Sequence, residues 1–286
     1  MYQSGLILEG GGMRGIYTTG VLDAFLEENL EFSSIYGVSA GSCHACSYMS
    51  KQKGRAYRSL VDYLDDPDCC GVRSYMKTGN VFGVDLLYSQ IPNVLDPFDY
   101  DEFERYPGRF FAVLTNVDTG EPEYIRIKNL KKQIWAIRAS SSLPLLSKTL
   151  VVHGRHYLDG AIADSIPIRR SMEAGNVKNV LVLTREEGYQ KGPNELMPLM
   201  KIRYAHSKEF LEKAENRHIR YNETLDFIRK EEEAGNVFVI RPSEKVTVGR
   251  VEKNKEKLEH LYQLGLEDGR NNMEAMKQYL ERQVLL

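Results

Sequence analysis

The chain has 286 residues, which is enough for one large core or for one core with an appendage. Its formal net charge of -2 excludes a bulk electrostatic attraction to nucleic acid, and 42% apolar with 27% charged residues is typical of a globular protein. No run approaches the roughly 18 apolar residues of a membrane-spanning helix, and the first residues lack a signal-peptide pattern, so any lipid would be met from the water side.

The first predicted elements alternate between strand and helix. Residues 5–9 form an apolar run that predicts a buried strand, and a glycine-rich turn separates it from a helix over 15–28. Residues 34–38 predict a second strand, which leads directly into a helix over 40–52. Two successive units of strand, turn and helix indicate an α/β fold.

The alternation continues through the middle of the chain. Further strands are predicted at 109–117, 121–127, 149–158 and 178–184, with a helix at 129–139. The turn Asp118-Thr119-Gly120 is typical of a hairpin between the first two of these strands. The pattern predicts an α/β architecture with a mostly parallel central sheet.

The last third of the chain is richer in charge and more helical. One or two long helices are predicted over 195–233, followed by a strand at 236–242 and a long helix over 251–283. Apolar residues recur at helical spacing in the last helix, which favours packing on the rest of the protein over a partner-binding surface. We therefore expect a first domain over 1–190 and a mostly helical extension over 191–286 packed on it.

The motif that carries most chemical information follows the second predicted strand. Residues 37–41 read Gly37-Val38-Ser39-Ala40-Gly41, which is a G-x-S-x-G pattern between a strand and a helix. In a nucleophile turn the serine backbone is strained and sharply bent, and the flanking glycines provide room for it. The N–H groups of the following helix point toward developing negative charge. The pattern predicts Ser39 as a nucleophile, with a plain strand–helix turn as the alternative.

A glycine-rich run after the first strand has two interpretations. Gly10, Gly12 and Gly15 match the dinucleotide fingerprint G-x-G-x-x-G, or the N–H groups of the run form an oxyanion hole. A dinucleotide domain would have an acid at the end of its second strand. Here that strand ends at Ser39, and Glu31 precedes it. We favour the oxyanion hole, with a dinucleotide-binding module as the alternative.

The base that would activate Ser39 is less obvious. No evident catalytic setting surrounds any of the six histidines, which are His44, His153, His156, His206, His218 and His260. Asp159 follows an apolar strand in the turn Asp159-Gly160-Ala161. Partial burial and a hydrogen bond to Ser39 would make this carboxylate a stronger base. From spacing alone, a turn-forming aspartate is an equally good interpretation.

The four cysteines are Cys43, Cys46, Cys69 and Cys70. The first two form a C-x-x-C pattern, which can indicate a redox pair or half a zinc site. They fall on a helix that should be buried, where cysteine packs well, and the adjacent second pair has poor geometry for a mutual disulfide. We interpret all four as thiols of a cytoplasmic protein without a metal site.

Three ordered blocks together resemble the patatin-like phospholipase family. They are the glycine run over 10–15, the turn over 37–41 and Asp159-Gly160-Ala161. A fourth segment, Ala139-Ser140-Ser141-Ser142-Leu143-Pro144, is similar to the family's stretch of Ala and Ser before a Pro. The resemblance covers roughly residues 5–185 and implies a three-layer α/β/α fold for a catalytic domain over 1–190.

The resemblance also implies a mechanism. Ser39 would attack an acyl ester, Asp159 would take its proton, and an acyl-enzyme would be hydrolysed by water. The implied oxyanion block consists of Gly10, Gly11, Gly12, Met13, Arg14 and Gly15. Within it, N–H groups around Gly11 and Gly12 would bind the oxyanion and Arg14 would help to fix the loop. No metal or other cofactor is implied.

The substrate is defined only by class. The resemblance implies a lipid ester, such as a phospholipid or lysophospholipid, with peripheral membrane contact and without nucleic acid. Acyl transfer and a non-catalytic lipid-binding protein on the same fold stay open, as do the ester position and the oligomeric state. Residues 74–100 are rich in Tyr, Phe, Leu and Val, which suits an acyl groove or lid and equally well suits ordinary packing.

Overall fold

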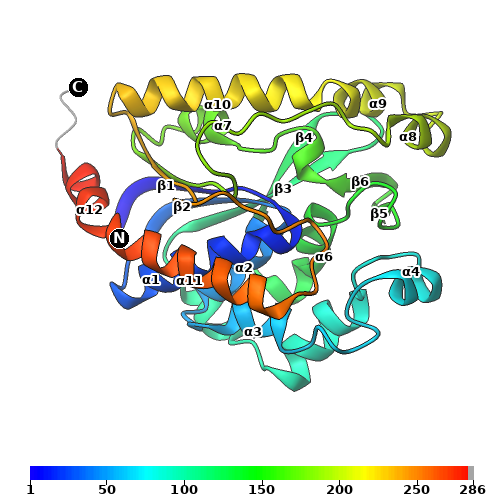
Figure 1. Ribbon diagram of the computed structural model, residues 1–286, viewed down its shortest axis with the longest axis horizontal. Coiled ribbons are helices and arrows are strands. Elements are labelled where there is room, and N and C mark those ends of the chain that lie inside the picture. The colour runs from blue at the N-terminus through cyan, green and yellow to red at the C-terminus, as the bar shows by residue number, and fades with distance from the viewer. Residues whose placement is uncertain (283–286) are drawn as a thin grey trace.

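An eight-stranded sheet runs through the middle of the computed structural model, which describes residues 1–282 (Figure 1). The strands are β1 (Tyr2–Leu8), β2 (Phe32–Val38), β3 (Arg109–Asn116), β4 (Pro122–Ile127), β5 (Leu150–Val152), β6 (Arg155–Asp159), β7 (Asn179–Val182) and β8 (Val237–Ile240). Their order is β5-β6-β3-β2-β1-β7-β8, and β4 pairs with β3. The five neighbouring strands β3, β2, β1, β7 and β8 are parallel. Strands β4 and β6 pair antiparallel with β3, and β5 pairs antiparallel with β6. The mostly parallel sheet is confirmed.

Helices cover both faces of this sheet. They are α1 (Ile16–Glu27), α2 (Ala40–Met49), α3 (Arg55–Val61), α4 (Val72–Thr78), α5 (Tyr100–Arg105), α6 (Leu130–Ser140), α7 (Ile168–Glu173), α8 (Met197–Arg203), α9 (Lys208–Glu215), α10 (Arg217–Glu233), α11 (Lys255–Asn271) and α12 (Met273–Glu281). Short 3-10 turns occupy η1 (Gly12–Gly15) and η3 (Gly160–Ile162), and a π-helical segment occupies η2 (Leu86–Leu95). In Figure 1, α7 and α10 lie above the sheet, and α1, α2 and α11 lie below it. The α/β/α layering is confirmed.

The central strand β1 separates two cores. Leu6 and Leu8 belong to the large cluster that includes α1 and α2, whereas Ile7 belongs to the cluster that includes Tyr221 of α10. Successive side chains of a strand point to opposite faces, so one apolar run supplies both cores. This explains why β1 has no alternation of polar and apolar residues.

Three elements differ in extent from the sequence prediction. The strand expected at 149–158 is the hairpin β5–β6, whose turn carries positive φ at His153 (50°) and Gly154 (78°). The helical stretch expected at 195–233 forms three helices, and the helix expected at 251–283 is divided at Asn272. The Asn272 side chain donates to the Asp268 carbonyl at 2.8 Å, a local bond that competes with helix continuation. Residue 283 of that helix, and residues 284–286 of the expected extension, lie outside the described residues.

The C-terminal third is joined closely to the rest of the structure. Strand β8 pairs with β7 in the same sheet, and α11 packs along α1 (Figure 1). Two glycines allow this close approach: a Cβ on Gly265 would lie 2.1 Å from the Tyr17 carbonyl oxygen, and one on Gly20 would lie 2.2 Å from that of Tyr262. The boundary near residue 190 stays a prediction.

The Gly265→Ala variant is expected to lower the free energy of unfolding by about 1–3 kcal/mol, because the new methyl group would meet backbone that cannot move alone. Thermal and chemical denaturation would measure this loss. Gly192→Ala is the matched control, since nothing lies within 4 Å of its Cβ position and no positive φ is required there. Equal stability of both variants would contradict the close packing of α11 on α1.

Candidate active site

Ser39 lies in the sharp turn between β2 and α2. Its backbone has φ 55° and ψ -124°, a strained conformation for a residue with a side chain. A Cβ on Gly37 would lie 2.6 Å from Ser42 Cα, and one on Gly41 would lie 2.4 Å from the Leu8 carbonyl oxygen. Both flanking positions of the motif therefore require glycine because backbone approaches backbone.

Asp159 reaches Ser39 because two strands end toward each other along the same edge of β3. In the register, Val38 at the end of β2 is opposite Val113, and Asp159 at the end of β6 is opposite the next residue, Leu114. Strand β2 runs parallel to β3 and β6 runs antiparallel to it, so their last residues meet. The Ser39 hydroxyl donates to Asp159 Oδ2 at 2.6 Å.

The Asp159 carboxylate is fully buried, and each of its oxygens accepts a hydrogen bond. Its Oδ1 accepts a hydrogen bond from the Ala161 N–H at 2.8 Å, while Oδ2 faces Ser39. Gly160 follows directly, and a Cβ there would lie 2.0 Å from the Val113 carbonyl oxygen. The Asp-Gly-Ala sequence is thus explained residue by residue: a carboxylate, a position without room for a side chain, and an N–H donor.

Burial raises the pKa of Asp159 above its ordinary value. The hydrogen bonds from Ser39 and Ala161 oppose this rise, as do the positive charges of Arg217 and Arg250. A carboxylate with a raised pKa is a stronger base than a solvated one, which suits proton transfer from a hydroxyl group.

The glycine run over 10–15 lies beside this pair. A Cβ on Gly10 would lie 2.7 Å from Ser39 Cβ, and Gly12 has φ 58°. The Met13 N–H donates to the Arg250 carbonyl at 3.1 Å. The Arg14 N–H donates to the Gly11 carbonyl at 3.3 Å.

These bonds divide the predicted oxyanion block into two parts. The N–H groups of Met13 and Arg14 are already used by backbone carbonyls. Gly15 is a packing position, where a Cβ would lie 2.8 Å from Ala40 Cβ. The remaining donors near Ser39 are the N–H groups around Gly11 and Gly12.

Two serines that the sequence did not assign to the site connect its parts. The Ser39 N–H donates to Ser140 Oγ at 3.0 Å, and Ser140 donates to the Val113 carbonyl at 2.7 Å. The Asp159 N–H donates to the Ser142 carbonyl at 2.8 Å. Both serines belong to the Ala-Ser-rich stretch, and the composition of that stretch was the one sequence signal that could have pointed to them. Their contacts with Ser39 and Asp159 depend on the fold and could not be predicted from the stretch itself.

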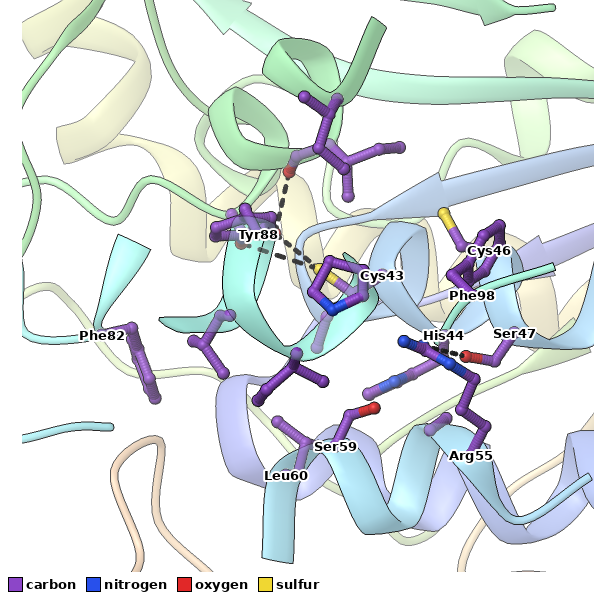
Figure 2. A pocket seen from close by; sticks show the side chains of 18 of the residues that line it. Cys43, His44, Cys46, Ser47, Arg55, Ser59, Leu60, Phe82, Tyr88 and Phe98 are labelled. Atoms are coloured by element: carbon purple, nitrogen blue, oxygen red, sulfur yellow. Dashed lines mark hydrogen bonds between the residues drawn. The ribbon is translucent and has the colours of Figure 1, made fainter. Parts of the chain in front are cut away.

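An apolar pocket of about 160 Å³ opens at Ser39. Helices α2, α3 and α6 and the segment 82–100 line it, with Cys43, Leu60, Phe82, Leu87, Tyr88, Ile91, Phe98 and Ile134 among its walls. Figure 2 shows Cys43 and Tyr88 on one side of the pocket and Ser59 and Leu60 of α3 on another. The segment 74–100, with its Tyr, Phe and Leu residues, thus contributes a wall of this pocket.

The histidines and cysteines do not complete the Ser39–Asp159 pair. Within residues 1–282, no histidine is hydrogen-bonded to Ser39, and His44 lies in the apolar pocket, where burial lowers its pKa to about 4. All four cysteines are free thiols, and burial raises the pKa of Cys43. The described part of the chain groups no three His, Cys, Asp or Glu side chains as metal ligands. Over the same residues, no helix is both long and apolar enough to cross a bilayer.

Comparison with known proteins gives matches to two families. A family described as patatin-like phospholipase matches residues 6–171, and a family described as a domain of unknown function matches residues 207–281. The two regions together contain the Ser39–Asp159 pair and most of the C-terminal third.

Individual relatives are similar over part of their length. The uncharacterized protein YjjU of Escherichia coli is 31% identical over 186 residues, which are 63% of this chain and 51% of YjjU. Lysophospholipase nte1 of Aspergillus fumigatus is 27% identical over 174 residues, which are 57% of this chain and 11% of that protein. The chain thus spans about half of YjjU and about a tenth of the lysophospholipase. Among solved structures, VipD from Legionella pneumophila aligns over 96% of this chain and 67% of its own, with 13% identity and a TM-score of 0.46.

Proposed function

The chain belongs to the patatin-like phospholipase family, and we propose that it is a serine acyl-ester hydrolase of lipids. Ser39 and Asp159 act as its dyad, and the reaction passes through an acyl-enzyme. The observation that carries the proposal is the 2.6 Å hydrogen bond from Ser39, which lines an apolar pocket, to a buried carboxylate. The substrate class is a phospholipid, a lysophospholipid or another lipid ester.

The first half of the reaction transfers the acyl group to Ser39. The Oγ atom attacks the ester carbonyl carbon while its proton passes to Asp159 Oδ2, and the carbonyl electrons move to oxygen. The N–H groups around Gly11 and Gly12 then stabilise the oxyanion, assisted by the N-terminus of α2. As the tetrahedral intermediate collapses, the alcohol leaves with the proton held by Asp159.

The second half releases the acid. Asp159 takes a proton from water, and the resulting hydroxide adds to the acyl carbon. When the second tetrahedral intermediate collapses, the proton returns to Ser39 Oγ and the fatty acid leaves. One carboxylate therefore serves as base and acid in turn, so no histidine is needed in the cycle.

The acyl chain is assigned to the apolar pocket. Ser39 lines this pocket together with the apolar residues Leu60, Leu87, Ile91 and Leu143. Contact with apolar walls removes the chain from water at about 25 cal/mol per Å². This provides a reason for preferring long acyl chains.

Filling the pocket should shorten the preferred acyl chain. In the Leu60→Trp variant, kcat/KM for a decanoyl ester is expected to fall at least tenfold relative to that for an acetyl ester, since the indole occupies chain volume. Hydrolysis of a chromogenic ester series would measure the ratio. Leu199→Trp is the control, because Leu199 is 55% exposed on α8 and lies outside the pocket. An unchanged chain-length profile in Leu60→Trp would place the acyl site elsewhere.

Peripheral membrane contact is proposed through α4. Val72, Tyr75 and Met76 expose 77%, 44% and 82% of their surface, although large apolar side chains are usually covered. The residues before α4 are held against the pocket wall, because the Gly71 N–H donates to the Val81 carbonyl at 2.8 Å and Cys70 bridges to Phe82, which lines the acyl pocket. The cytoplasm remains the proposed location, on the sequence argument from the four thiols.

The activity itself is tested on the unmodified chain. Hydrolysis of a chromogenic short-chain ester and of phospholipid vesicles is expected, together with covalent labelling by a fluorophosphonate probe. A protein that neither hydrolyses any ester nor reacts with the probe would contradict the proposal and favour a lipid-binding role on the same fold.

A further inference from the structure

A second, smaller cavity also opens at Ser39. It shares Gly12, Ser39 and Leu143 with the apolar pocket, so the two cavities meet at the nucleophile. An ester bound at Ser39 has two portions, the acyl chain and the alcohol. The apolar pocket suits the acyl chain, which leaves the second cavity for the alcohol.

The second cavity is strongly cationic. Its lining contains five basic side chains, which are Arg14, Arg185, Lys191, Arg217 and Arg250, against two carboxylates, Glu9 and Asp159. Arg14 comes from the turn η1, whereas the other four follow β7 in the chain. Most of this charge is therefore supplied by the C-terminal third of the protein.

The two carboxylates offset only part of this charge, because two negative groups face five basic side chains. Glu9 accepts hydrogen bonds from the Thr184 N–H at 2.7 Å and from the Tyr221 hydroxyl at 2.6 Å. Asp159 is occupied by Ser39 and Ala161. Within residues 1–282, none of the five basic side chains lies in an ion pair of 4.0 Å or less. The cavity thus holds an uncompensated positive charge.

Two of the guanidinium groups have an Nε atom without a hydrogen-bond partner in the described residues, although Arg185 Nη1 donates to the Val246 carbonyl at 3.2 Å. Arg14 is only 7% exposed, and its Nε has no partner in the described structure; the same is true of the Nε of Arg185. A buried donor without an acceptor is costly, and an anion in the cavity would relieve that cost.

The basic side chains raise each other's electrostatic energy. Burial lowers the pKa of Lys191 to about 7, and the charges of Arg217 and Arg250 add to the effect. Burial likewise lowers the pKa of Arg217 to about 10, with Arg250 contributing. A bound anion would act in the opposite direction and favour the charged forms.

We propose that this cavity binds the phosphate of a lipid phosphomonoester, such as lysophosphatidate, while the acyl chain lies in the apolar pocket. The proposal rests on the function proposed above. Arginine and lysine side chains bind phosphate oxygens through strong charge-assisted hydrogen bonds. The C-terminal third, including Arg217 and Arg250 of the region matched to a domain of unknown function, thereby selects the head group.

A choline head group fits this cavity poorly. Its quaternary ammonium would face five basic side chains, and the ring of Tyr221 in the cavity lining, like that of the neighbouring Tyr189, already has a cation beside it. The Arg185 guanidinium lies 4.5 Å from the ring centroid of Tyr189, and the Lys191 ammonium lies 4.5 Å from that of Tyr221. We therefore expect discrimination between lipids that share an acyl chain and differ in the head group.

The test compares kcat/KM for oleoyl lysophosphatidate, oleoyl lysophosphatidylcholine and mono-olein. The unmodified protein is expected to prefer lysophosphatidate over the other two by at least tenfold, as charge-assisted bonds to phosphate would provide. Lys191→Met and Arg217→Gln should reduce this preference about tenfold or more, and Lys191→Arg should retain most of it. Lys245→Met, on the exposed loop before α11 and outside the cavity, should leave it unchanged.

Competition with inorganic phosphate tests whether the cavity binds the phosphate of the lipid substrate or only a free anion. If the cavity holds the lipid phosphate, inorganic phosphate should raise KM for lysophosphatidate and should do so less in Lys191→Met. Equal hydrolysis of all three lipids would overturn the proposal, and so would a phosphate effect on mono-olein without a preference for lysophosphatidate. Hydrolysis of none of them would instead contradict the function on which the proposal rests.

Discussion

The Ser39→Ala variant is expected to lose at least about a thousandfold in kcat for ester hydrolysis. The variant removes the only atom that can form the acyl-enzyme in the proposed reaction, while the methyl side chain still fits the turn. Assays on a chromogenic ester and on phospholipid vesicles would measure the loss, and fluorophosphonate labelling should disappear with it.

Ser89→Ala is the matched control for this substitution. Ser89 is exposed on η2 and lies outside both cavities, so activity and labelling should persist. Thermal denaturation of both variants would show that the fold is retained. Full activity or unaltered labelling in Ser39→Ala would refute the assignment of the nucleophile.

The Asp159→Asn variant is expected to lower kcat by about 10²–10⁴-fold and, at the same time, to raise the unfolding temperature. The amide can still accept the Ala161 N–H but cannot take a proton from Ser39. Because burial raises the pKa of Asp159, its charge destabilises the folded state, and the neutral amide removes that penalty. A gain of about 1 kcal/mol would raise the midpoint by roughly 2–4 °C.

The raised pKa of Asp159 also fixes how the stability difference between the two proteins changes with pH. A carboxyl group whose pKa is higher in the folded than in the unfolded chain destabilises the fold above its folded pKa and has no effect below the unfolded value. The stability difference between Asp159→Asn and the unmodified protein should therefore be full above the raised pKa of the folded chain and vanish below the pKa of the unfolded chain, about 3.9. Activity of the unmodified protein should fall as the pH decreases through the raised pKa of Asp159. A variant that is equally active, or less stable at neutral pH, would refute the role of this carboxylate.

The order of strands and helices could be predicted from the sequence because it is encoded locally. The strand before Ser39 and the helix after it follow from an apolar run, a sharp glycine turn and helical periodicity. The hairpin at Asp118-Thr119-Gly120 follows from turn residues. The divided helices of the tail did not follow, because the side-chain bond of Asn272 that ends α11 is as compatible with a helix interior as with its end.

The site could be predicted only in its parts. Ser39 could be predicted from its own turn, whereas the turn of Asp159 is equally typical of a structural aspartate. The family resemblance was needed to pair it with Ser39, 120 positions away in the chain. Their distance depends on the pairing of β2 and β6 with β3, which no local pattern encodes. The same holds for Ser140, whose hydroxyl accepts the Ser39 N–H. It holds also for Lys191, which joins a cationic cavity only because the fold brings it beside basic residues that are distant in sequence.

Strand β3 sets the separation of Ser39 and Asp159, because β2 and β6 both pair with it. It sets where β2 ends and where β6 ends, and one residue along a strand corresponds to about 3.3 Å. A substitution in β3 changes its packing. A residue inserted or deleted between the part of β3 that pairs with β2 and the part that pairs with β6 would displace Asp159 from Ser39 by more than the length of their hydrogen bond. The step from Val113 to Leu114 is therefore the place in β3 where a change of length, rather than of side chain, would take the proposed dyad apart.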